Sequence, residues 1–173
     1  MRKFIFSILG CITILSCSDG DLQIETIDFD SASIQYCANP VADAKNLMFK
    51  INDSEALILE LQSGALNRGV AGDTVITEST VPGQSQVTYR VFSDAVNKDY
   101  FCSDIPTVDP KVIDEVVAEG GMVIIETMPV ENDTTRFEHN ISLSGISFVT
   151  GNGERITNLA INEFGEVVTV VPD

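Results

Sequence analysis

The chain has few residues of the types that usually carry out chemistry, and His139 is its single histidine. In residues 137–143 apolar and polar positions alternate, and His139 shares a face with Phe137, Ile141 and Leu143. This position predicts a packed or edge histidine. A zinc site is not expected, because no cysteine pair lies near His139. The G-x-S-x-G elbow of serine hydrolases is also absent. We therefore expect no catalytic, metal or cofactor-binding residue.

Acidic residues are abundant, with 26 Asp and Glu against 10 Lys and Arg. They are scattered along the chain and form no D-x-[DN]-x-[DN]-G-x₅-E calcium loop, so we interpret most of them as solvated charge. A pair of carboxylates that meets in the fold could still hydrolyse a polymer, and this alternative stays open. The absence of Trp and the presence of only three Tyr count against a carbohydrate substrate, because sugar sites usually offer aromatic faces.

The beginning of the chain has the layout of an export signal. Arg2 and Lys3 are followed by an apolar run over residues 4–15 and then by the small residue Ser16. The run is shorter than the about 20 residues that a membrane span needs. We therefore expect residues 1–16 to be a signal peptide that is removed.

The sequence Ile14-Leu15-Ser16-Cys17 resembles a bacterial lipobox, in which cleavage precedes a cysteine that receives the lipid. The resemblance implies that Cys17 is lipidated. Cys11 also fits the box, but the apolar run before it covers only residues 4–9 and is shorter than such signals need. An ordinary signal peptide with a chance cysteine is the alternative.

Residues 18–21, Ser-Asp-Gly-Asp, are similar to the acidic tag of Bacteroidota-type lipoproteins that are exported to the cell surface. The resemblance covers only the first 21 residues. It implies an outer-membrane, lipid-anchored protein that faces the outside, with a periplasm-facing protein as the alternative. Asp30-Ser31, Asp73-Thr74 and Asp133-Thr134 look like O-glycosylation acceptor sequences of the same envelopes, or else are ordinary turns.

The formal net charge of −16 limits the possible partners. Removal of Arg2 and Lys3 with the signal would make the remaining chain more acidic still. Such a chain repels phosphate backbones, so nucleic acid is not an expected partner. It also repels anionic lipid head groups, so acyl chains would have to anchor it to the membrane.

Cys37 and Cys102 remain if Cys11 leaves with the signal and Cys17 is lipidated. In an exported protein they then have only each other to pair with, and we expect a disulfide between them. Two separately buried thiols are the alternative.

The rest of the chain reads as short strands separated by turns. A helix is predicted near residues 110–119, because Asp109 suits the N-cap, Pro110 the first turn and Gly120 the end, with valines and an isoleucine on one face. We expect a hairpin at residues 47–61 and another at residues 74–92 around Pro82-Gly83. Further strands are expected at residues 22–29, 122–128, 135–143, 146–150, 155–161 and 167–171.

These features predict a mainly β fold, a β-sandwich of about ten short strands with one short helix, as a single domain over residues 22–173. Cys17 and residues 18–21 would form its lipidated tether. We hypothesise a non-enzymatic binding or envelope-assembly module, held beside another envelope protein. A hydrolase of envelope or environmental polymers is the alternative, and a carrier would need a sizeable internal cavity.

Overall fold

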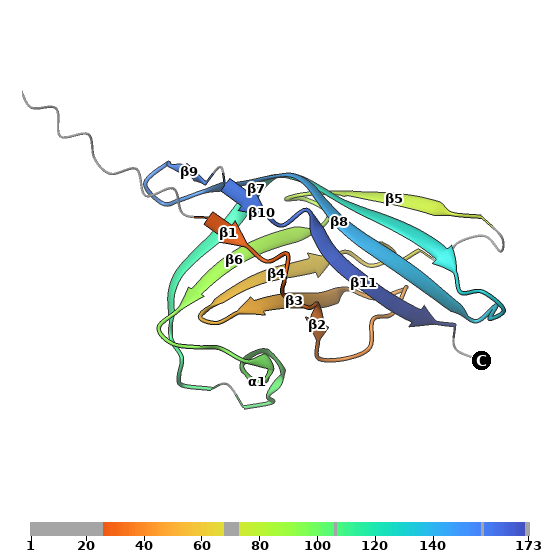
Figure 1. Cartoon of the computed structure of the whole chain (residues 1–173), viewed down its shortest axis with the longest axis horizontal. Helices are drawn as coiled ribbons and strands as arrows, with labels where there is room; N and C mark the ends of the chain where they lie inside the picture. Colours follow the sequence, from red (N-terminus) through yellow and green to blue (C-terminus); the bar gives the residue numbers. More distant parts are fainter. Residues whose placement is uncertain (1–25, 68–72, 106, 157, 172–173) are drawn as a thin grey trace, which may run out of the picture.

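Figure 1 shows a computed structural model of the chain, which describes residues 26–67, 73–105, 107–156 and 158–171. The expected signal peptide, Cys17 and the tether lie outside these ranges. In the described part the chain forms eleven strands and one short helix. In chain order these are β1 (Thr26–Asp28), β2 (Gln35–Tyr36), β3 (Asn46–Asn52), β4 (Glu55–Leu61), β5 (Val75–Thr80), β6 (Gln86–Phe92), α1 (Lys98–Cys102), β7 (Val112–Pro129), β8 (Arg136–Val149), β9 (Arg155–Ile156), β10 (Asn158–Ala160) and β11 (Glu163–Val170).

The strands form two packed layers that share the long strand β7 (Figure 1). The first layer has the order β2-β3-β4-β6 and ends on residues 112–117 of β7. The second layer has the order β5-β7-β8-β11, built on residues 118–129 of β7, and β9 adds to the end of β8. All these pairs are antiparallel, whereas β1 and β10 form a separate parallel pair. The predicted β-sandwich is confirmed.

A bulge at Gly120 and Gly121 lets β7 pass from one layer to the other. Before the bulge Val116 and Ala118 point into the core, whereas after it the odd-numbered residues Val123 and Ile125 do so. Gly121 has a φ of 125°, and a Cβ there would lie 2.8 Å from the Cα of Ile146. Only glycine fits this crossing, because both the backbone conformation and the close strand contact exclude a side chain.

The core lies between the inner faces of the two layers and is mostly apolar. Each strand contributes every second residue, as expected for strands with one buried face. The first layer provides Met48, Leu57, Leu59, Val87 and Tyr89, and the second provides Val123, Ile125, Ile141, Leu143, Phe148 and Val167.

The prediction of a helix near residues 110–119 is wrong, because β7 begins at Val112 and runs through the rest of this segment. The residues of the expected apolar stripe lie on both faces of a strand: Val116 is buried, whereas Ile113 and Val117 are 65% and 44% exposed. Valine and isoleucine favour strands, and the neighbour β6 supplies the hydrogen bonds. The described helix, α1, lies earlier in the chain. No helix in the described ranges is long and apolar enough to cross a membrane.

Two further expectations on the strands need correction. Residues 136–149 form one strand, β8, in which Gly145 adopts a φ of 61° instead of ending it. The turn at Pro82-Gly83 is present, but β5 and β6 do not form a hairpin: β5 pairs with β7 in the second layer, and β6 pairs with β4 and β7 in the first. The hairpin at β3 and β4 is confirmed.

The expected disulfide is present: Cys37 and Cys102 are joined with an S–S distance of 2.00 Å. The bridge holds α1 against the outer face of the first layer, where Phe49, Ile58 and Phe92 are buried beneath it. Phe101 stacks on Phe49 with ring centroids 4.3 Å apart, and Tyr100 meets Phe92 edge-on at 4.8 Å. The outer face of the first layer is therefore partly covered by the chain itself.

Candidate functional site

The outer face of the second layer carries a groove that follows β8. Because side chains alternate between the two faces of a strand, Asn140 and Ser142 of β8 point away from the core. In the register of the sheet, Asn140 lies between Glu126 of β7 and Glu166 of β11. Short polar side chains thus form the floor, and longer side chains on the neighbouring strands form the walls.

The next row along β8 repeats this arrangement. Ser142 lies between Ile124 of β7 and Glu163 of β11, and Ile76 of β5 extends the wall beyond Glu126. The groove has a volume of about 670 Å³, within the size range of ligand sites in proteins. The two walls stand on strands about 10 Å apart, twice the strand spacing, which leaves room for one extended chain between them.

The face around the groove is strongly acidic. Glu126, Glu163 and Glu166 line the groove and are exposed, and Glu78 and Glu138 extend from the same face. Among the described residues no ion pair neutralises any of these five carboxylates. The groove therefore combines negative charge with the apolar surface of Ile76 and Ile124, and this combination suits a cationic partner that also offers apolar side chains.

The groove glutamates bear on both binding and catalysis. Glu126, Glu163 and Glu166 are exposed, so their side chains are accessible to a cationic partner. Within the described ranges no three or more His, Cys, Asp or Glu residues are placed to hold a metal ion. The convergence of three glutamates on one groove is still a feature that a hydrolase would use.

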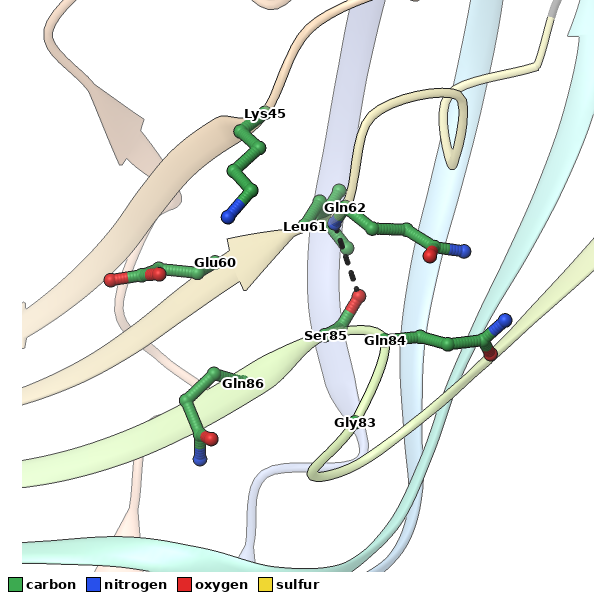
Figure 2. Close-up of a pocket in the computed structure, with 8 residues that line it drawn as sticks. All are labelled: Lys45, Glu60, Leu61, Gln62, Gly83, Gln84, Ser85 and Gln86. Atoms are coloured by element: carbon green, nitrogen blue, oxygen red, sulfur yellow. Dashed lines mark hydrogen bonds between the residues drawn. The ribbon is translucent and has the colours of Figure 1, made fainter.

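A smaller hollow lies at the edge of the first layer (Figure 2). Lys45, Glu60, Gln62, Gln84 and Gln86 surround it, but its volume is only about 160 Å³. Figure 2 shows that Gln62 and Gln84 point to one side and Glu60 to the other, so the polar groups diverge. The hollow is smaller than the ligand sites of proteins, and its side chains share no common target.

His139 is a packed histidine, as predicted. It is fully buried on the inner face, and its ring nitrogens hydrogen-bond to Thr127 Oγ1 and Thr169 Oγ1, each at 2.8 Å. Burial lowers the pKa of His139 to about 4, so the ring is neutral at neutral pH. Both ring nitrogens are thus occupied by hydroxyl groups of the same layer. The groove lies on the opposite face of the sheet, so His139 does not reach it.

The three candidate glycosylation acceptors, Ser31, Thr74 and Thr134, are all exposed and lie outside the strands. A sugar could therefore be attached to each of them without disturbing the core. Their modification remains a prediction, and so does the lipidation of Cys17.

Sequence reasoning missed two features that the fold assembles. The groove residues come from four strands, and their sequence signal is only the short polar side chains on one face of β8.

The second missed feature is Lys50. It is buried between the layers, where its Nζ donates to the Glu163 carbonyl at 2.9 Å and lies 5.9 Å from the centre of the Phe164 ring. The pKa of Lys50 is lowered overall, because the effect of burial is larger than that of the nearby acids Asp30, Glu163 and Asp28, which raise it. Lys50 links β3 of the first layer to β11 of the second.

Similarity to known proteins does not assign the chain to a family. No protein-family model matches the chain, no curated protein is significantly similar to it in sequence, and no solved structure is significantly similar to it.

Proposed function

We propose that this chain is a lipid-anchored protein of the bacterial envelope whose β-sandwich acts as a non-enzymatic binding or assembly module. Acyl chains on Cys17 attach it to the outer membrane, at the cell surface or, as the alternative, facing the periplasm. The groove along β8 binds another envelope protein. The signal layout and the lipobox resemblance of the first 21 residues support the anchoring.

The observation that carries the binding role is the groove along β8, in which apolar and acidic side chains meet on one outer face. On the outer face of the first layer α1, which the disulfide holds in place, covers Phe49, Ile58 and Phe92, whereas Ile113 and Val117 of the same layer stay exposed. On the second layer Ile76 lines a groove of ligand-site size and is 64% exposed. An exposed apolar surface of this kind, surrounded by charges, is typical of interaction sites.

The anchor would keep the groove close to membrane-bound partners. Residues 18–25 separate Cys17 from β1. At about 3.3 Å per residue they reach at most about 26 Å. The partner is therefore expected in or beside the same membrane, which suits an accessory subunit of an envelope assembly.

Site-specific photo-crosslinking in the native envelope tests this proposal. A photoreactive residue at Asn140, on the groove floor, should give one defined crosslinked protein. The same residue at Lys98, in the exposed part of α1, should not. Replacing Glu126 and Glu166 with Lys should remove the Asn140 crosslink. Equal crosslinking from both positions, or none from Asn140, would contradict binding through the groove.

A hydrolase is the second candidate, favoured by the three glutamates that line one groove. In that case the purified protein releases reducing ends from an envelope polysaccharide. Replacing Glu126 with Gln should abolish the release, while the exposed control Glu60→Gln should leave it intact. The binding proposal expects no release from either protein.

A further inference from the structure

We propose that the free edge of β5 pairs with an extended segment of a partner protein, which adds a strand to the second layer. The partner segment carries basic and apolar residues in alternation. This inference goes beyond the groove, because the contact that it proposes is made by the main-chain groups at the border of the layer (Figure 1). Strand addition of this kind is a common mode of peptide recognition.

The hydrogen bonds around β5 show which main-chain groups point to the free edge. The N–H of Val81 donates to the Gly121 carbonyl at 3.0 Å, in register with the pairs of β5 and β7. Antiparallel strands alternate between hydrogen-bonded and non-hydrogen-bonded pairs. The odd-numbered residues of β5 therefore bond to β7, and the main-chain groups of Ile76, Glu78 and Thr80 point away from it.

Only the last of these three residues has partners on the free side. The Thr80 N–H donates to Gln84 Oε1 at 2.9 Å, and the Thr80 carbonyl accepts from the N–H groups of Gln84 and Ser85 at 3.1 Å. Among the described residues no corresponding bond reaches the N–H or C=O of Ile76 or Glu78. Two donors and two acceptors thus remain for an incoming strand.

Parts of two other strand edges carry features that hinder pairing, as edges of natural sheets often do. On β11 the Glu163 carbonyl accepts from Lys50, and Ile34 packs against Gly165, where a Cβ would lie 3.2 Å from Ile34. On the first part of β7 a bulge interrupts the pairing with β6. In contrast, β5 runs for six residues without proline, lysine, glycine or bulge.

The exposed side chains of β5 indicate the chemistry of the partner. Ile76 and Glu78 point to the outer face, Ile76 beside Glu126 and Glu78 beside Ile124. An added strand would place one residue opposite Glu78 and another, two positions along, opposite Ile76. Lysine or arginine complements the first and an apolar residue the second. A second copy of this chain fits poorly, because each copy carries a formal charge of −16.

Amide hydrogen exchange of the purified full-length lipoprotein in detergent tests the pairing directly. The probe is a peptide of about ten residues in which threonine alternates with valine and lysine. On binding, the amides of Ile76 and Glu78 should become protected, whereas those of Thr77 and Ser79 are already protected by β7. A control peptide with glutamate in place of lysine should not bind. Protection only outside β5 would overturn the proposal.

Two substitutions at one position separate the main-chain contact from the charge. Glu78→Pro removes a donor on the free edge without touching the bonds to β7, and it should weaken the lysine peptide at least about tenfold. Glu78→Lys should lose the lysine peptide and bind the glutamate peptide instead. If the proline variant does not fold, the binding of the lysine and glutamate peptides to Glu78→Lys tests the inference by itself. Binding of the lysine peptide that is unchanged in Glu78→Lys would refute the inference.

The remaining controls distinguish this edge from its competitors. Glu166→Lys changes the groove on β11, three strands away from β5, and should leave peptide binding intact. Failure of the groove proposal and failure of this one therefore give different results. Analytical ultracentrifugation should show a monomer. A dimer that Glu78→Pro dissociates would mean that a second copy occupies the edge, which would overturn the assignment to a basic partner.

Discussion

Acidification should destabilise the fold through His139. Burial holds the pKa of this ring at about 4, whereas an unfolded chain has it near 6.5. As the pH falls below 6.5 the unfolded chain takes up the proton first, so the free energy of unfolding decreases until the folded ring is also protonated near pH 4. Above pH 6.5 the ring is neutral in both states, so the free energy of unfolding loses nothing through His139. The difference between the two pKa values corresponds to about 3 kcal/mol.

Urea unfolding between pH 7 and pH 4 measures this loss. The matched variant is His139→Gln, whose neutral amide can both donate to and accept from Thr127 and Thr169. Its stability at pH 7 should be lower, because the packing is less complete, but it should lack the histidine-linked loss. Asp133, whose pKa is lowered by the hydrogen bond from the Thr135 hydroxyl, titrates in both proteins and cancels. Equal losses in both proteins would refute the reasoning.

Three further predictions concern the anchor, the tag and the bridge. Cys17→Ala should leave the protein uncleaved or soluble in membrane fractionation while Cys11→Ala changes nothing, and a variant without Cys17 that is still anchored would disprove lipidation there. Protease added to intact cells should digest the wild type but not a variant with Ala at Asp19 and Asp21, and equal shielding of both would make the acidic stretch a simple linker. Cys37→Ser should lower the free energy of unfolding by about 4 kcal/mol in denaturant titrations, because the bridge closes a loop with a sequence separation of 65. If Cys37 and Cys102 of the wild type react with a thiol reagent after unfolding without reductant, there is no bridge.

Sequence patterns predict the features that depend only on residues close together in the chain. The hairpin of β3 and β4 followed from two apolar runs around a short polar turn, because neighbouring strands of this kind need only that turn in order to pair. The alternation around His139 predicts a packed or edge position, and the side chain is fully buried. These predictions succeeded because the side-chain period of a strand is the same wherever the strand lies.

Patterns failed where a distant strand determined the structure. Residues 112–117 have a spacing that also fits one face of a helix, but they pair with β6 and are continued by the second part of β7. The turn at Pro82-Gly83 reverses the chain, yet it sends β5 and β6 to different layers. A turn residue specifies a local backbone conformation and does not specify the neighbour to which each strand bonds.

The sequence by itself determined the β content and the sandwich class, because alternation and turns are properties of the chain. It also predicted the bridge between Cys37 and Cys102, on the expectation that Cys11 is removed and Cys17 is lipidated. The tertiary structure alone decided the groove, the free edge of β5 and the burial of Lys50. Glu126, Asn140 and Glu166 are far apart in the sequence and become one row only when β7, β8 and β11 align in register. Register arises from long-range hydrogen bonds and from the packing of both layers, and a linear pattern of residue types contains neither.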